Sequence, residues 1–169
     1  MKFKLRPYQE EASKKAVEFF LDEKKNWNAL EVLPTASGKS LILADIAARL
    51  KDKVLVFSPT KEILEQNYKK YCSYGFDNAS IYSASFKSKE ISDVTFATIG
   101  SVKGHPELFT DFKYILIDEV HLVKPESGMY KEFLDKLKSK VIGLTATPFR
   151  LYSYQNYGSI LKFLTRSRD

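Results

Sequence analysis

The 169-residue chain has one cysteine and only two histidines. A single cysteine excludes an intramolecular disulfide, and two histidines without a cysteine pair leave no ligand set for a zinc site. No apolar run is long enough to cross a bilayer, and the first residues lack the apolar stretch of a signal peptide. We therefore expect a chain of the reducing, cytoplasmic compartment with no membrane contact, in which Cys72 is a buried structural thiol.

The composition is that of one ordinary globular domain, with 44% hydrophobic and 28% charged residues. Lysine and arginine exceed aspartate and glutamate, which gives a formal net charge of +6 and a sequence pI near 9.2. Such a balance suits a polyanionic partner without requiring one.

Helical and strand-like hydrophobic periods alternate along the chain. This alternation predicts an α/β fold with a mainly parallel central β-sheet flanked by helices. The expected helices are residues 8–21, 41–50, 61–71 and 126–137, and the expected strands are residues 29–33, 54–57, 79–82, 94–97, 114–117 and 141–144.

The segment LPTASGKS, residues 33–40, follows the first expected strand and has the residue types that bind a nucleoside triphosphate. Gly38 allows backbone amides to approach phosphate oxygens, Lys39 brings a positive charge to the β- and γ-phosphates, and Ser40 offers a hydroxyl to Mg²⁺. The strict phosphate-loop pattern has glycine at the position of Leu33. Taken alone, Gly-Lys-Ser is also compatible with a helix start capped by serine.

The tetrad DEVH, residues 118–121, follows the most hydrophobic expected strand. In open α/β sheets, ligands bind beyond the carboxyl ends of the strands, so this tetrad and the phosphate loop are expected at one edge. There Asp118 can hold Mg²⁺ and Glu119 can orient an attacking water. Solvated turn residues are the structural alternative for the tetrad alone.

Two further segments have chemistry that fits a nucleotide. In LRPYQ, before the first expected helix, the Gln9 amide can pair with an adenine edge and the Arg6 guanidinium can stack on the base. The same segment is compatible with a plain helix start. In GLTATP, after the last expected strand, Thr145 and Thr147 can relay hydrogen bonds between the nucleotide and a second ligand.

In this order and spacing, the segments resemble the first motor domain of superfamily 2 helicases and translocases. LRPYQ resembles the Q motif, LPTASGKS motif I, DEVH the DExH form of motif II, and LTATP motif III. SPTK (58–61) is similar to motif Ia, and TIGS (98–101) to the next nucleic-acid-contacting motif. The resemblance spans residues 5–150 and is strongest to type III restriction motors and RadD-like helicases.

The resemblance implies a RecA-like P-loop NTPase fold, with residues 1–150 as the first ATP-binding domain. It also implies a second RecA-like domain, expected in the same full-length polypeptide. Residues 151–169 contain aromatic and basic side chains and are expected to begin the connection to that domain. Packing of this segment back onto the sheet is a compatible alternative.

The family also implies roles for individual residues, with ATP and Mg²⁺ as cofactors. Ser40 and Asp118 would hold Mg²⁺, and Glu119 would act on the hydrolytic water beside Lys39. His121, Thr145 and Thr147 would couple nucleotide state to the grip on nucleic acid, which we expect to be DNA rather than RNA. The expected nucleotide-binding residues are Arg6, Gln9, Pro34, Thr35, Ala36, Ser37, Gly38, Lys39, Ser40 and Leu41. The expected nucleic-acid contacts are Pro59, Thr60, Lys61, Thr98, Gly100 and Ser101.

Two departures from the family pattern affect the expected activity. Ala36 stands where glycine is usual, so a side chain is present where the phosphates approach closely. Nothing resembles motifs IV to VI, which in the family lie on the second domain and include an arginine finger. We therefore expect an ATP hydrolase that is weak or inactive as this isolated domain.

Two other classes of protein remain as alternatives. The first is an ATP-dependent nucleic-acid-binding module without productive turnover, against which the intact Lys39 and Glu119 argue. The second is a P-loop kinase or GTPase, but neither an acceptor-binding lid nor a guanine-reading Asn-Lys-x-Asp type motif is present.

Overall fold

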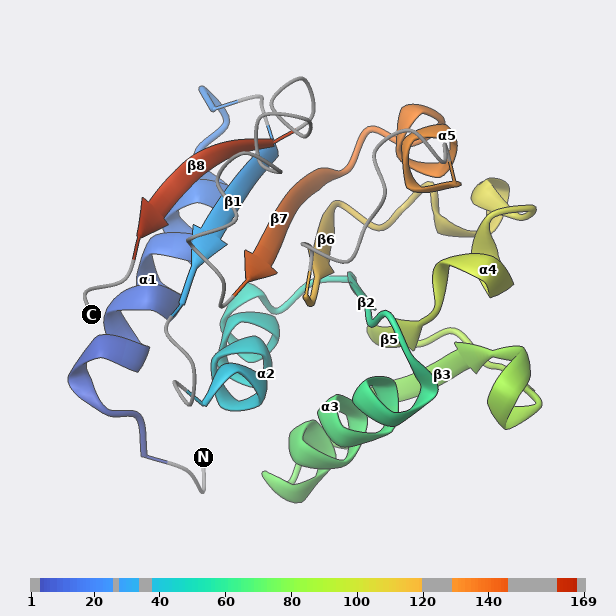
Figure 1. Ribbon diagram of the computed structural model, residues 1–169, viewed down its shortest axis with the longest axis horizontal. Helices are drawn as coiled ribbons and strands as arrows, with labels where there is room; N and C mark the ends of the chain where they lie inside the picture. The colour runs from blue at the N-terminus through green and yellow to red at the C-terminus, as the bar shows by residue number, and fades with distance from the viewer. Residues whose placement is uncertain (1–3, 26–27, 34–37, 120–128, 146–160, 167–169) are drawn as a thin grey trace.

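A central β-sheet organises the computed structural model, which describes residues 4–25, 28–33, 38–119, 129–145 and 161–166. Among these residues the sheet has eight strands in the order β4-β3-β5-β2-β6-β7-β1-β8 (Figure 1). Neighbouring strands are parallel except for β3 and β4, which pair antiparallel. The strands are β1 (Asn28–Val32), β2 (Val54–Phe57), β3 (Ala79–Ser83), β4 (Ser88–Lys89), β5 (Val94–Ala97), β6 (Tyr114–Ile117), β7 (Lys140–Thr145) and β8 (Leu161–Arg166).

Helices cover both faces of the sheet, as the figure shows (Figure 1). One core joins the sheet to the first three helices through side chains such as Phe19, Ile46 and Leu64. The opposite core joins it to later segments through Val102 and Phe133. This arrangement confirms the expected α/β fold with a mainly parallel sheet. The helices are α1 (Pro7–Leu21), α2 (Lys39–Leu50), α3 (Lys61–Ser73), α4 (Ile99–Val102) and α5 (Met129–Asp135), with 3₁₀ turns η1 (Ala84–Phe86) and η2 (Pro106–Phe109).

The first two helices are joined by a buried polar cluster. The carboxyl of Asp45 on α2 is 1% exposed and accepts hydrogen bonds from Ser13 on α1 and from Arg49, whose Nε lies 2.7 Å away. Because a buried carboxylate is costly without such partners, the pair of helices has a preferred register. The middle of α1 is thereby held beside the middle of α2.

Two local expectations differ from the structure. Helix α5 runs over Met129–Asp135, shorter than the expected 126–137, of which residues 126–128 lie outside the described part. Cys72 is free but only half-buried, so the expectation of a buried thiol was wrong. Its neighbour Tyr71 takes the inward position on α3, which turns Cys72 partly toward the surface.

The end of the chain contributes to the sheet. Strand β8 pairs in parallel with β1, from Asn28 opposite Leu161 to Val32 opposite Arg166. Residues 151–160 lie outside the described part, and the proposed domain boundary at residue 150 stays a prediction.

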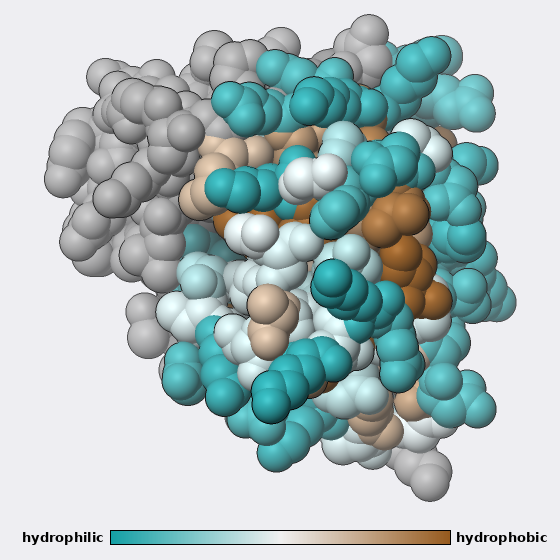
Figure 2. Space-filling model, turned by 90° about the vertical axis from the view of Figure 1, so that its right-hand side faces the viewer, coloured by the Kyte–Doolittle hydropathy of each residue, from teal (hydrophilic) through white to brown (hydrophobic). Residues whose placement is uncertain are grey.

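The surface of the described residues is mainly polar. Figure 2 looks at the side of the molecule that has α4, where hydrophilic side chains frame smaller hydrophobic areas. The large apolar side chains exposed among the described residues include Ile91, Leu108 and Met129, each 37% to 43% exposed. None of the described helices is both long and apolar enough to span a membrane.

Candidate functional site

Five neighbouring parallel strands end at the same edge of the sheet, and the candidate residues gather there. The amide of Asp118, directly after β6, donates to the Phe57 carbonyl at the end of β2 over 2.8 Å. On the other side, the Leu33 amide after β1 donates to the Thr145 carbonyl at the end of β7 over 2.8 Å. The strand order therefore brings Asp118, Leu33 and Thr145 to one edge, where the sequence predicts a ligand site.

A charged cluster lies at the centre of this edge. The Lys39 ammonium is 3.3 Å from Oδ1 of Asp118 and also forms an ion pair with the Glu119 carboxylate. The side chains of Lys39, Asp118 and Glu119 are 17%, 4% and 26% exposed, so the cluster is largely shielded from water while Glu119 still reaches solvent. Residues 80 positions apart thus form one site.

The start of α2 is suited to an anion. Gly38 is the N-cap with φ of +77°, in the left-handed region that favours glycine, and none of the described side chains caps the helix. The backbone N–H groups of Lys39 and Ser40 precede the first hydrogen bond to the Gly38 carbonyl and can point at phosphate oxygens, helped by the helix dipole. No acidic residue stands in this first turn to repel an anion.

Gln9 lies against the phosphate loop. A Cβ at position 38 would overlap the Gln9 amide nitrogen, so the two segments touch at this point. The Gln9 side chain is 5% exposed, and its Oε1 accepts the Arg6 backbone N–H over 2.8 Å in a capping box. LRPYQ therefore does begin a helix, as its alternative interpretation says, and this helix start places the Gln9 amide next to Gly38.

The residues present fit a magnesium ion. Oδ1 of Asp118 is buried and has no hydrogen-bond partner among the described residues. Ser40 and Asp118 both hydrogen-bond to the side chain of Asn67, and carboxylate and hydroxyl oxygens are the ligands that Mg²⁺ prefers. Among the described residues there is no group of three or more His, Cys, Asp or Glu side chains that could hold a metal.

Glu119 adopts an unusual backbone conformation. Its φ is +53°, one of three positive values at non-glycine positions in the described residues. Such a conformation costs about 1 kcal/mol or more and persists where the surroundings impose it, often at functional sites. At the end of β6 it turns the Glu119 carboxylate toward Lys39.

The expected nucleic-acid contacts follow β2 and β5, on the same edge. Thr60 is the N-cap of α3 and accepts the Ile63 amide over 3.2 Å, while the Lys61 ammonium lies 5.4 Å from the Phe86 ring centroid. Thr98 and Ser101 are joined by a hydrogen bond of 3.1 Å at the start of α4. The structure brings these residues to one side of the sheet, and their contact with nucleic acid stays a prediction.

Of the remaining expected site residues, the structure describes two. Thr145 is 5% exposed at the end of β7, and Leu41 lies in the first turn of α2. The others lie outside the described residues: Pro34, Thr35, Ala36, Ser37, His121 and Thr147.

Asn67 was missed by the sequence reasoning. It lies on α3, is 2% exposed, and hydrogen-bonds both Ser40 and Asp118. A signal was present: the buried positions of α3 are Leu64, Asn67 and Tyr71, so an amide interrupts an otherwise apolar stripe.

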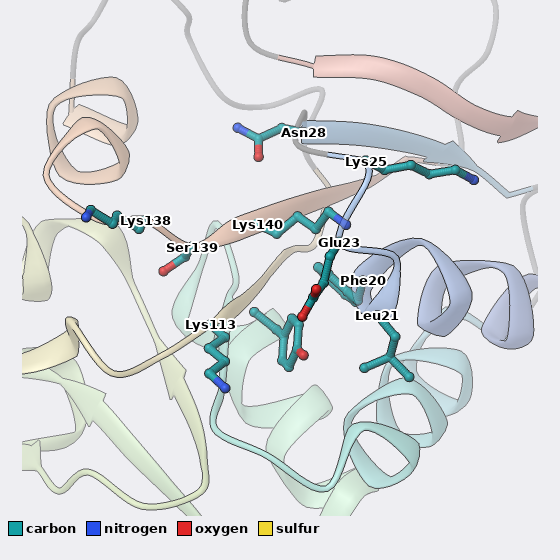
Figure 3. Close-up of a pocket in the computed structure, with 10 residues that line it drawn as sticks. Phe20, Leu21, Glu23, Lys25, Asn28, Lys113, Lys138, Ser139 and Lys140 are labelled. Atoms are coloured by element: carbon teal, nitrogen blue, oxygen red, sulfur yellow. The ribbon is translucent and has the colours of Figure 1, made fainter.

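A hollow of about 510 Å³ lies at the opposite, amino edge of the sheet (Figure 3). Its lining includes Asn28, Tyr114 and Lys140, which begin β1, β6 and β7. The Lys140 ammonium donates to the carbonyls of Phe19 and Asp22 at the end of α1, the latter over 2.8 Å. This lysine therefore has a structural role, and the hollow is separate from the charged cluster.

Comparison with known proteins gives the family. The family ResIII, described as "Type III restriction enzyme, res subunit", matches residues 2–150. The chain belongs to this family. This ResIII chain is also 32% identical over 152 residues to the DNA 3'-5' translocase XPB2 of Sulfurisphaera tokodaii, covering 88% of the chain and 32% of that protein.

Solved structures show the same fold. The UvsW helicase of bacteriophage T4 matches with a TM-score of 0.74 and 23% identity, over 97% of this chain and 60% of that one. The SWI2/SNF2 ATPase core of Sulfolobus solfataricus was solved in complex with double-stranded DNA. It matches with a TM-score of 0.69 and 23% identity, over 88% of this chain and 33% of that one. The ResIII chain thus spans between a third and three fifths of these proteins. Its resemblance to a superfamily 2 motor domain is confirmed.

Proposed function

We propose that this ResIII domain binds Mg·ATP and forms the nucleotide-binding half of a motor that moves on or unwinds DNA. The observation that carries the proposal is the convergence of Lys39, Ser40, Asp118 and Glu119 at one sheet edge, beside an uncapped helix start. These are the groups that phosphoryl transfer to water requires.

Each residue has a distinct task in this proposal. Lys39 compensates the charge of the β- and γ-phosphates, and the first amides of α2 bind their oxygens. Ser40 and Asp118 hold the metal ion, while Glu119 orients the attacking water and accepts its proton. Bound Mg·ATP supplies the phosphoryl group that is transferred. Gln9 selects adenine from its position against Gly38.

The nucleic-acid side of the motor is assigned to the segments after β2 and β5. Their hydroxyls and amides, together with Lys61, would hold the sugar-phosphate backbone without reading sequence. DNA is preferred over RNA because the XPB2 relative is a DNA translocase. A DNA motor works inside the cell, in agreement with the compartment expected from the sequence.

Efficient turnover needs a second RecA-like domain. The chain spans only part of its relatives, and the family's arginine finger lies on the other domain. An arginine finger contributes about 10³ to 10⁵ in rate, so the isolated chain should bind ATP and hydrolyse it slowly.

The test is Mg·ATP turnover by the 169-residue chain, with and without double-stranded DNA, beside a longer form that includes a second motor domain. We expect slow turnover in the short chain and DNA-stimulated turnover in the longer one. Fast turnover by the short chain would refute the half-motor proposal. Tight Mg·ATP binding with no turnover in either form would indicate the nucleotide-dependent binding module instead.

Nucleotide competition tests the adenine assignment separately. ATP should displace a fluorescent ATP analogue well and GTP poorly, and replacing Gln9 with alanine should reduce that difference. Equal competition by GTP in the intact chain would overturn the role given to Gln9.

A further inference from the structure

One buried amide connects the two residues expected to hold magnesium. Oδ1 of Asn67, on α3, accepts a hydrogen bond from the Ser40 hydroxyl over 2.8 Å. Nδ2 of the same side chain donates a hydrogen bond to Oδ2 of Asp118 over 2.9 Å. The same Nδ2 donates to Ser58, directly after β2, over 3.2 Å. The side chain is 2% exposed, so water does not replace these bonds.

The bond to Ser40 matters because a serine hydroxyl has a single proton. To bind a cation, the oxygen must present its lone pairs and direct the proton elsewhere. In the structure the hydroxyl donates its hydrogen bond to Asn67 Oδ1. A second contact, from Gln66 Nε2 to the same Ser40 oxygen, is long at 3.4 Å, comes from an exposed side chain and constrains the hydroxyl little.

In the bond to Asp118, Asn67 is the donor, and it uses Oδ2 of the carboxylate. The other oxygen, Oδ1, has no hydrogen bond among the described residues. Oδ1 lies 3.3 Å from the Lys39 ammonium, with which it forms an ion pair. The oxygen and the nitrogen of one amide thus orient both expected metal ligands, Ser40 and Asp118. Groups that orient ligands in this way typically change metal affinity 10- to 100-fold when they are removed.

We infer that Asn67 is a positioning residue for the magnesium site, holding Ser40 and Asp118 with their free lone pairs toward the ion. The inference rests on the proposed function, since it concerns the metal of the same site. It differs from a purely structural role, in which the amide only anchors α3 to β2 and β6. An anchor would affect folding and all ligands alike, whereas a positioning residue acts on the metal-dependent part of nucleotide binding.

The experiment compares the affinity for a fluorescent ATP analogue in MgCl₂ with that in EDTA, and records thermal unfolding for each variant. Asn67→Leu removes the amide at similar volume, and Asn67→Gln keeps the amide but displaces it by one methylene. The matched control is Asn78→Leu, because Asn78 also accepts a side-chain hydrogen bond, from Tyr71 over 2.8 Å, but lies outside the network.

We expect wild type and Asn78→Leu to gain the same affinity from Mg²⁺. In Asn67→Leu this gain should fall about tenfold or more, with the affinity in EDTA within about twofold of wild type. Asn67→Gln should lose less, because the amide chemistry is retained, and it serves where the leucine variant does not fold. An unchanged gain in a folded variant, or an equal loss with and without Mg²⁺, would overturn the inference. If wild type gains nothing from Mg²⁺, the proposed function itself fails before any variant is considered.

Discussion

Glu31 has its carboxyl group inside the sheet, on β1, two residues before the LPTASGKS segment. It is 0% exposed, and neither of its oxygens has a hydrogen-bond partner among the described residues. Burial disfavours the charged form and raises the pKa of Glu31 to about 8, while Lys15 lowers it to a smaller extent. At neutral pH this side chain is therefore mostly a neutral acid in the folded protein.

This raised pKa makes stability depend on pH. Below about pH 4.5 the group is protonated in both the folded and the unfolded chain and contributes no pH dependence. Between pH 4.5 and 8 only the folded state keeps the proton, so the free energy of unfolding falls as pH rises, on the order of 1 kcal/mol per pH unit. Thermal unfolding from pH 5 to 8 should show this slope in wild type and a flatter profile in Glu31→Gln. Identical profiles would contradict the assignment.

Gly38 has a left-handed backbone conformation at the start of α2, where the phosphates are proposed to bind. In Gly38→Ala the added Cβ would sit at φ of +77° and overlap the Gln9 amide. We expect a loss of about 1–2 kcal/mol in the free energy of unfolding and at least tenfold weaker binding of the ATP analogue. Gly104→Ala is the control, because a Cβ there meets nothing within 4 Å. Equal behaviour of the two variants would show that the conformation of Gly38 is not needed.

At the scale of elements, Lys140 joins the start of β7 to the end of α1. Its ammonium donates to the carbonyls of Phe19 and Asp22 and lies 4.4 Å from the Phe19 ring centroid. The last turn of α1 has no basic residue of its own that could interact with these carbonyls. Lys140→Met keeps the stem and removes the charge, leaving these carbonyls without their donor. We expect a loss of about 1–2 kcal/mol and a melting temperature lower by roughly 3–6 °C.

The matched control for this change is Lys138→Met. Lys138 is exposed and lines the same hollow (Figure 3), but among the described residues no hydrogen bond or ion pair joins it to α1. Its replacement should leave the melting temperature within about 1 °C. A similar drop in both variants would assign the effect to general charge rather than to the contact with α1.

The elements best predicted from the sequence are the fully buried strands. Val54–Phe57, Val94–Ala97 and Tyr114–Ile117 have the predicted bounds, because both faces of each strand are packed and the apolar run is continuous. Strand β8 and the short η1 and α4 had no such signal, since their formation depends on pairing and packing with distant segments. The strand order likewise comes from contacts that a local pattern does not contain.

The candidate site also contains residues that the sequence predicts and residues that it does not. Lys39, Ser40, Asp118 and Glu119 were predictable because phosphate and Mg²⁺ chemistry requires those residue types after buried strands. For Asn67 the local signal was only an amide in the apolar stripe of α3, and its role was not predictable because its partners lie 27 and 51 residues away. The burial of Glu31 without a partner is also a property of the assembled sheet.

At the scale of the whole molecule, the two edges of the sheet differ in what they offer a polyanion. The expected nucleic-acid contacts at the carboxyl edge include one cation, Lys61, and the net charge of +6 comes largely from lysines elsewhere, such as Lys138 at the amino edge. Total charge would therefore attract DNA without defining where it binds. The edge that is proposed to bind DNA can be tested by salt dependence, because each phosphate contact made by a cation releases counterions.

Salt titration of DNA affinity separates the two edges. If Lys61 contacts a phosphate, Lys61→Ala should lower the magnitude of the slope of log K against log salt by about 1, and weaken binding similarly for unrelated DNA sequences. Lys138→Ala removes the same charge from the amino edge and should leave the slope unchanged. A slope that falls equally in both variants would mean that DNA is attracted by net charge alone. A slope that falls only in Lys138→Ala would move the DNA-binding surface to the amino edge, away from the nucleotide that is proposed to control it.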